Sequence, residues 1–532
     1  MNRFLDQQTV KRMLQNATST TEQQKTLGQD QILRLAFWLL AIVLGGLQAG
    51  ANSYKLSSED SISYLDVADA YLRGDWTTAI NAYWSPLYSW LLGLVRLVLQ
   101  PSPAWEFATV KLTNGLIYLG ALASFEVFLH EFIASYRRSI SSDSRFLQIP
   151  DWAWRLLGYS LFLWAALVWS TLHSDTPDLC TTALIYLAAG ILLRLQQSPT
   201  WAGFAMLGAV LGLGYLTKAV VLPLTVVFLG VSAFSAPFRQ VLPKLLAAVL
   251  AFMLIAAPFI TALSFSKGRL TIGDTGRLNA AWTHNPDLLD RVWLGEPPEN
   301  GTPLHPPRTV FADPEAYEFA TPIVGTYPLW TDASYWNDGL KPTFNLGRQL
   351  RIIAKNLVFY TKQFLGFLVL SYLLLICAGG TLKPSLRSLR QGWRFLVPAL
   401  AGLSAYLVII DLSWAAFPAQ PSTRYIASFI SLVVAGVFFS VRLPNTRRSR
   451  QLLLGFVIAV LVLVGGRLTY QGVQNLAAVL KLPENTAWTI ARSAQQVGIQ
   501  PGSPIAILGP DPSHQAWARL ARVRIIAQIP NA

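Results

Sequence analysis

The feature that most constrains this chain is a series of long apolar runs with almost no charge. About twenty such residues cross the hydrocarbon core of a bilayer. Only 13% of the 532 residues are charged, about half the share of an ordinary soluble domain. We therefore expect an all-α polytopic membrane protein with about eleven transmembrane helices. The runs lie near residues 31–50, 106–131, 155–172, 177–197, 200–217, 219–236, 241–263, 355–379, 393–411, 424–441 and 451–468.

Basic loops give the predicted bundle an orientation. The segments KPSLRSLRQGWR and RLPNTRRSR carry only positive charge, and Lys and Arg favour the cytoplasmic side. Counting spans from these loops places the N-terminus in the cytoplasm and residues 51–85 and 264–354 outside. A crossing by residues 86–100 would break this order, so we interpret that short stretch as an interfacial or re-entrant helix. The alternative is that one basic loop breaks the charge rule.

The net charge of +14 fits basic cytoplasmic loops better than nucleic-acid binding, because no basic stretch is long enough to cover several phosphates. Cys180 and Cys377 both lie in apolar runs and form no disulfide framework or zinc cluster. We expect a bacterial inner-membrane protein.

The chain divides into five predicted segments. Residues 469–532 contain two short strands around a helical turn. The predicted outer loop at residues 264–354 is long, and loops of such length commonly serve as lids or binding surfaces. The segments are a cytoplasmic tail (1–30), an N-terminal transmembrane catalytic module (31–263) with its first outer loop (51–85), a long outer loop (264–354), C-terminal transmembrane helices (355–468) and a small outer soluble tail (469–532).

The first outer loop is acidic. Asp60 follows the first span closely, with Glu59 beside it and Tyr64 one helical turn on. One interpretation is that Asp60 caps a helix and the other acids form a solvated face. The other is that Asp60 is a reacting carboxylate at the membrane surface.

Two cations stand at unusual positions. Lys218 interrupts an apolar stretch, where an ionisable group is costly unless it has a partner or a function. Arg424 and Tyr425 enter a late span together. Contact with a phosphate explains both cations, while snorkelling and interfacial anchoring are the structural alternatives.

These motifs resemble those of membrane glycosyltransferases of the C-type fold, including protein mannosyltransferases and lipid A aminoarabinose transferases. An acidic pair, a Tyr, Gly-Asp-Trp and then Trp-Ser-Pro-Leu-Tyr are similar to their first outer loop. The resemblance implies that Asp60 is catalytic. It also implies substrate-binding residues, namely Glu59, Tyr64, Asp175, Asp178, Lys218, Arg424 and Tyr425.

The resemblance further implies transfer of a hexose or pentose from a polyprenyl-phosphate donor to a lipid, glycan or protein acceptor at the outer face, with inversion. A divalent metal, Mg²⁺ or Mn²⁺, would be held by Asp60 and Asp178. The pair is Glu-Asp rather than the Asp-Glu of protein mannosyltransferases, which weakens the case for a protein acceptor. The alternative function is a multi-pass transporter or a lipid or glycan flippase, for which paired half-sequences and midplane charges are expected.

Overall fold

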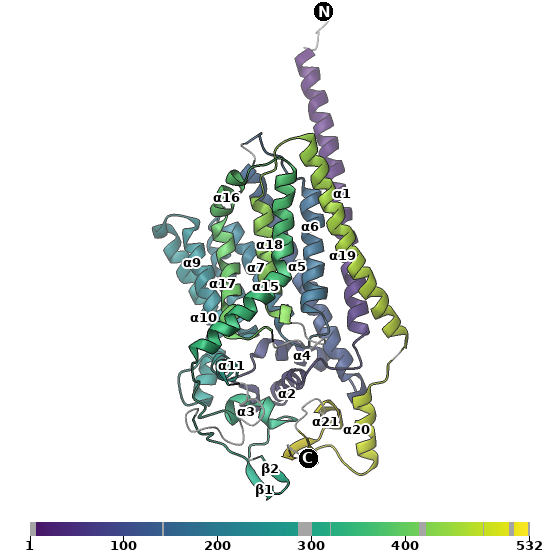
Figure 1. Cartoon of the computed structure of the whole chain (residues 1–532), viewed down its shortest axis with the longest axis vertical. Helices are drawn as coiled ribbons and strands as arrows, with labels where there is room; N and C mark the ends of the chain where they lie inside the picture. The colour runs from purple at the N-terminus through teal and green to yellow at the C-terminus, as the bar shows by residue number, and fades with distance from the viewer. Residues whose placement is uncertain are drawn as a thin grey trace, which may run out of the picture.

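The computed structural model of the chain describes residues 7–140, 143–285, 301–319, 321–413, 422–481, 483–509 and 515–529, and the side chains of residue 28 and of residues from 30 onward in these ranges. Parts of the predicted N-terminal tail, long outer loop and C-terminal tail therefore lie outside the described residues. The rest is a helical bundle with a smaller layer of short helices and strands at one end, called here the site end (Figure 1).

Helices make up the bundle and most of the site end. The first half of the chain contains α1 (Gln7–Gly50), α2 (Asp60–Arg73), α3 (Trp76–Ala79), α4 (Pro86–Leu99), α5 (Glu106–Ile140), α6 (Asp151–Trp164), a π-helical turn (Ala165–Ser170), α7 (Asp178–Leu195), α8 (Trp201–Thr217), α9 (Val221–Ser232), α10 (Phe238–Ser266) and α11 (Thr275–His284). The second half contains β1 (Arg308–Ala312), β2 (Glu315–Glu318), α13 (Pro328–Thr331), α14 (Ala333–Trp336), α15 (Leu346–Cys377), α16 (Leu382–Gln391), α17 (Trp393–Ile409), α18 (Ala427–Ser440), α19 (Arg447–Lys481), α20 (Thr486–Gln496), β3 (Pro504–Leu508), α21 (Gln515–Ala521) and β4 (Arg524–Ile529).

The apolar helices make this a multi-pass membrane protein, but the predicted count of eleven spans is not confirmed. Within the described residues, six helices are long and apolar enough to cross a bilayer. A seventh is obtained if α16 and α17, bent by 77°, count as one span. The predicted runs 200–217, 219–236 and 424–441 form α8, α9 and α18, and 155–172 forms α6 with the π-helical turn. Helices α8, α9 and α18, with 17, 12 and 14 residues, are shorter than the roughly twenty residues that a straight crossing needs.

Close helix packing holds the bundle together. A Cβ on Gly190 of α7 would meet Phe128 Cα of α5 at 3.0 Å. A Cβ on Gly208 of α8 would lie only 1.9 Å from the carbonyl oxygen of Ala248 on α10. Small residues let neighbouring backbones approach in this way in membrane proteins, so these two glycines fix the α5–α7 and α8–α10 contacts.

The site end combines segments that lie far apart in the sequence. Strands β1 and β2 come from the predicted long outer loop, and β3 and β4 from the C-terminal tail. They form one sheet in the order β1-β2-β4-β3, in which Tyr317 of β2 pairs with Gln528 of β4. The two predicted tail strands and the intervening helical turn are confirmed as β3, α21 and β4. The tail is not a separate appendage, because β4 completes a sheet begun by the loop.

Several predicted boundaries change. Helix α1 continues the first span backward to Gln7, so the described part of the N-terminal tail is helical. The last membrane helix, α19, ends at Lys481 rather than near residue 468. The stretch 86–100 forms the fourteen-residue helix α4, which is not among the candidate spans and lies with α2 at the site end (Figure 1).

Candidate functional site

One carboxylate and two cations form the centre of the candidate site. Asp178 is the first residue of α7, Lys218 directly follows α8, and Arg424 lies just before α18. Lys218 Nζ forms an ion pair with Asp178 Oδ1, and Arg424 Nε donates to Asp178 Oδ2 at 3.1 Å. The Asp178 and Arg424 side chains are each 5% exposed, and Lys218 is 22% exposed. Three distant parts of the chain therefore bring two positive charges to one buried anion.

Backbone geometry explains why Lys218 reaches this centre. Its backbone is extended (φ −160°, ψ 128°) and stops α8, while its N–H still bonds to the carbonyl of Gly214. The side chain therefore leaves the helix end rather than a lipid-facing surface. Tyr425 supports both cations: Lys218 Nζ lies 4.2 Å from its ring centroid and the Arg424 guanidinium carbon 4.6 Å. Cation–π contacts of this kind stabilise desolvated positive charge.

Arg424 retains unused hydrogen-bonding capacity. Its Nη2 donates to Tyr425 Oη at 2.8 Å and its Nε to Asp178. Its Nη1 is buried and has no acceptor within the part of the chain that the structure describes. A buried guanidinium N–H without an acceptor is costly, so the geometry leaves a place for one more anionic or polar oxygen.

Asp60 faces the same centre. It is the first residue of α2 and is partly buried. Trp330 of the outer loop donates its Nε1–H to Asp60 Oδ1 at 3.1 Å. Burial raises the pKa of Asp60 above its ordinary value, although nearby Arg424, the Trp330 hydrogen bond and Lys218 act in the opposite direction. A carboxylate with a raised pKa is a stronger base than an ordinary Asp.

The capping interpretation of Asp60 is not confirmed. Glu59 occupies the cap position of α2, and its side chain makes no capping hydrogen bond. Instead, one carboxylate oxygen of Asp60 accepts the hydrogen bond from Trp330. Tyr64, one turn on, is buried and packs edge-on against Trp84 at 4.9 Å and Tyr88 at 5.1 Å between ring centroids. Its surroundings are thus those of an aromatic packing residue.

Aromatic rings surround Asp60. Trp330 lies 5.6 Å from Trp282 and 5.7 Å from Trp84 between ring centroids, and Tyr83 lies within 6 Å of both Trp84 and Trp282. Trp84 also donates its indole N–H to the Trp330 carbonyl. The first outer loop and the long outer loop therefore meet over Asp60 through their indole rings.

Asp175 makes a separate buried ion pair. Its oxygens accept from Lys111 Nζ at 2.6 and 2.7 Å and from Asn114 Nδ2 at 3.0 Å. Asp175 Oδ2 also accepts from the backbone N–H of Ser57 at 2.9 Å. Asp175 is completely buried. These contacts tie the turn before α7 to α5 and to the first outer loop, and the contact of Asp175 with a substrate stays a prediction.

Asp66 and Asp69 of the first outer loop are not part of a solvated face. Arg519 of α21 donates to Asp66 at 2.6 Å, Asp69 at 2.5 Å and Glu106 at 2.7 Å, and all four groups are buried. Asp66 Oδ2 also accepts from the backbone N–H of Thr326 in the long outer loop at 2.7 Å. Arg522 and Arg96 add further pairs to Asp69 and Glu106. We call Asp66, Asp69, Arg96, Glu106, Arg519 and Arg522 the tail network.

The residues at this centre do not suit the predicted divalent metal. Within the described ranges, no group of three or more His, Cys, Asp or Glu side chains could hold a metal ion. Both oxygens of Asp178 are engaged by cations, and Oδ2 also accepts from Thr176 at 2.8 Å. A divalent ion on Asp178 would have to displace two positive charges.

The predicted site residues thus fall into two sets. The structure brings together Asp60, Asp178, Lys218, Arg424 and Tyr425. It places Glu59 before α2, Tyr64 among aromatic rings and Asp175 in an ion pair with Lys111, and the substrate contacts of these three stay predictions. Sequence reasoning missed Trp330 as the partner of Asp60 and Lys111 as the partner of Asp175. Lys111 lies in an apolar run, so the cost of a charge there was an available signal.

Comparisons with known proteins give structural likenesses only. No protein-family model and no curated protein sequence matches this chain. It is similar to ArnT from Cupriavidus metallidurans in the apo state, with 15% identity, a TM-score of 0.45 and coverage of 92% of this chain and 84% of that one. For ArnT bound to undecaprenyl phosphate, the identity is 15%, the TM-score 0.38 and the coverage 92% and 76%. For the apo Archaeoglobus fulgidus oligosaccharyltransferase, the identity is 12% and the TM-score 0.42, and the alignment covers 93% of this chain and 64% of that one.

These alignments cover more than nine tenths of this chain.

Proposed function

We propose that the protein is a membrane glycosyltransferase that moves a sugar from a polyprenyl-phosphate donor to a hydroxyl or amine acceptor. The reaction takes place at the site end, which we assign to the outer face of a bacterial inner membrane. The observation that carries this proposal is the pairing of Lys218 and Arg424 beside Asp60, with the buried Nη1 of Arg424 lacking an acceptor.

A lipid phosphate fits this arrangement better than a neutral substrate. The two cations lie at the ends of apolar helices, where water and lipid meet, and a polyprenyl phosphate carries its charge at the same depth. Asp178 neutralises the cations in the free protein. A phosphate oxygen on Arg424 Nη1 would satisfy the remaining donor without breaking the contact between Arg424 Nε and Asp178.

The proposed reaction is a single displacement. The acceptor oxygen or nitrogen forms a bond to the anomeric carbon, and Asp60 takes the proton from that atom. The bond between the anomeric carbon and the phosphate oxygen breaks, and the electron pair leaves with the phosphate. Lys218 and Arg424 stabilise the growing negative charge, and fixed donors in a dry site do this effectively. Attack from the face opposite the leaving group inverts the sugar.

The aromatic rings over Asp60 suit a sugar. Trp330, Trp84 and Tyr83 present apolar surface next to a hydrogen-bonded carboxylate, which matches the mixed apolar and hydroxyl faces of a pyranose or furanose ring. Tyr425 shields the cations and Asp178 holds them. The chemistry of this chain needs no metal, because Lys218 and Arg424 already supply the charge that a divalent ion would contribute.

The test is transfer by the purified protein. Polyprenyl phosphates carrying different hexoses and pentoses are incubated with the protein, and release of free polyprenyl phosphate is measured together with acceptor modification. We expect release with at least one donor, and its loss in Asp60→Asn and Lys218→Ala. Asp143→Asn is the matched control, because Asp143 pairs with Arg145 in the loop between α5 and α6. Unchanged turnover in Asp60→Asn would contradict its role as base.

A further inference from the structure

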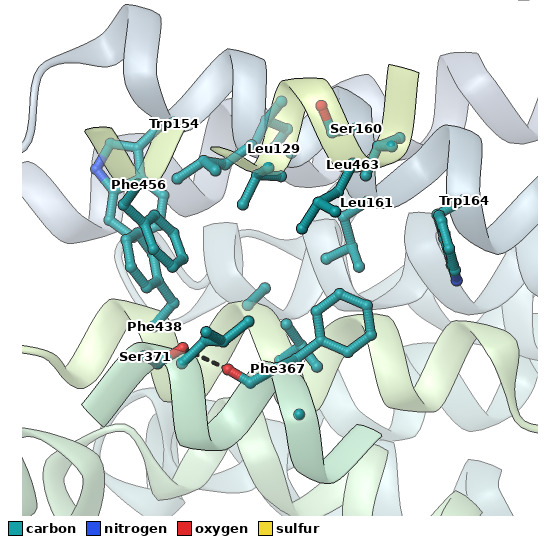
Figure 2. Close-up of a pocket in the computed structure, with 18 of the residues that line it drawn as sticks. Leu129, Trp154, Ser160, Leu161, Trp164, Phe367, Ser371, Phe438, Phe456 and Leu463 are labelled. Carbon is teal, nitrogen blue, oxygen red and sulfur yellow. Dashed lines mark hydrogen bonds between the residues drawn. The ribbon is translucent and has the colours of Figure 1, made fainter. Parts of the chain in front are cut away.

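The bundle contains a long apolar cavity apart from the Asp178 centre. Its volume is about 490 Å³, and helices α5, α6, α15, α18 and α19 supply its walls. Figure 2 shows Trp154, Phe438 and Phe456 together at one end of the view, with Leu161, Leu463, Trp164 and Phe367 farther along. Trp154 and Trp164 lie ten residues apart on α6, about 15 Å at 1.5 Å per residue. The cavity therefore has the shape and lining for a hydrocarbon chain.

The cavity opens sideways between α15 and α19. Leu370 of α15 and Leu463 of α19 both line it, yet they are 45% and 66% exposed. Residues on that outer surface would face acyl chains in a bilayer. A lipid can thus place a chain in the cavity without passing through the site end.

An exposed cation lies at this opening. Lys362 lines the cavity and comes from α15. Within the described ranges, its side chain has no hydrogen-bond or ion-pair partner. Counting from Cys377 at the far end of α15, Lys362 stands about 22 Å along the helix, which places it near the edge of a core about 30 Å thick. Lys362 therefore begins about 8 Å inside the edge of the core, a depth from which a lysine side chain can extend its charge to the headgroups.

Lys362 belongs to a row of cations. Arg348, Arg351, Lys355 and Lys362 are spaced by three, four and seven residues, so they lie on one face of α15. Lys355 forms a 3.4 Å ion pair with Asp411, and Arg351 is exposed. The row extends about 21 Å along the helix, so positive charge continues from Lys362 toward the site end, whereas a pocket for one phosphate would converge on a point.

We infer that this surface binds an anionic phospholipid of the surrounding bilayer, with its phosphate on Lys362 and one acyl chain in the cavity. Charge complementarity and the lateral opening select a bilayer phospholipid over a soluble ligand. The Lys218–Arg424 pair lies on other elements, so this site does not depend on the proposed transferase activity.

Native mass spectrometry of the full chain tests the inference. The probes are phosphatidylglycerol and phosphatidylcholine with the same acyl chains. We expect preferential retention of phosphatidylglycerol, weakened about fivefold in Lys362→Gln, in line with the contribution of one basic residue near an anionic lipid surface. Arg239→Gln, an exposed cation at the start of α10, is the control and should leave retention unchanged.

A second pair of variants tests the cavity. A Cβ at Gly366 meets nothing within 4 Å, so Gly366→Phe should fill the cavity without disturbing the helices and should reduce retention of phosphatidylglycerol. Gly230→Phe on α9, also unobstructed, is its control. The inference is overturned by equal retention of the two lipids, by unchanged binding in Lys362→Gln or Gly366→Phe, or by a polyprenyl phosphate that displaces phosphatidylglycerol at equal concentration.

Discussion

Replacement of Arg519 by Gln tests whether the tail network fixes the position of α2. Arg519 is buried and makes ion pairs with Asp66, Asp69 and Glu106 at 2.5 to 2.7 Å. The Gln variant leaves three buried carboxylates with less positive charge, and breaking one buried pair costs about 3–5 kcal/mol. At 1.4 kcal/mol per factor of ten, opening of the tail should rise at least ~100-fold.

Hydrogen exchange measures this opening directly. Amides of α21 and β4 should lose protection by two orders of magnitude or more in Arg519→Gln, and those at the start of α2 should follow to a smaller extent. Arg524→Gln is the matched control, because Arg524 is an exposed residue of the same tail. Arg519→Lys keeps the positive charge but not the planar guanidinium fork. The exchange protection of its tail should therefore lie between that of Arg519→Gln and that of Arg524→Gln. Equal protection of the tail in Arg519→Gln and in the parent would refute the assignment of the network as its anchor.

The same network predicts acid sensitivity. Burial would raise the pKa of Asp69, but Arg519 and Arg96 outweigh it and hold that pKa below the ordinary value. A carboxyl with a lowered folded-state pKa stabilises the fold above its unfolded pKa of about 4 and loses this contribution as the pH falls through the folded value. Exchange protection of the tail, corrected for intrinsic rates, should therefore be constant from neutral pH to about 5 and decline below about 4.

Three further predictions concern the site. Trp330→Phe removes a hydrogen bond that lowers the pKa of Asp60, so the acid limb of the transfer rate against pH should move to higher pH; an unmoved limb would separate Asp60 from the base role. Lys218→Ala should reduce turnover per folded molecule about 100-fold or more, as loss of one charge-stabilising donor does; retained activity of the folded fraction would argue for a structural lysine. Asp175→Ala leaves Lys111 buried without its counterion, so it should destabilise the protein by about 3–5 kcal/mol in a denaturation assay, and a stable variant with altered donor affinity would instead favour substrate contact.

Much of the centre was predictable because charge is so costly in apolar surroundings. Lys218 stands out in a run of apolar residues, and Arg424 opens a late apolar helix, so each required a partner. The shared partner, Asp178, was predicted as a site residue, but its simultaneous contact with both cations depends on how α7, α8 and α18 pack. The sequence contains no local signal for that packing.

The contacts around Asp60 were less predictable. Trp330 lies in a long loop of many prolines and aromatic residues, where no periodic pattern assigns a structure. The acids Asp66 and Asp69 look like an exposed helix face, because their partner Arg519 comes from the other end of the chain. Likewise, the sequence pattern of the tail predicted β3 and β4. No local pattern indicates, however, that β4 pairs with β2 of the long outer loop. The count of eleven spans is not confirmed where helices shorter than a bilayer crossing, such as α8 and α9, follow each other closely.

The position of β4 in the sheet has a consequence for biogenesis. Strand β4 lies between β2 and β3, yet it is translated after every membrane helix described above. The loop strand β2 therefore stays without this neighbour until the segment that follows α19 has been synthesised. A chain that ends before β4 would lack the strand that joins β2 to β3, so the site end is completed only late in synthesis.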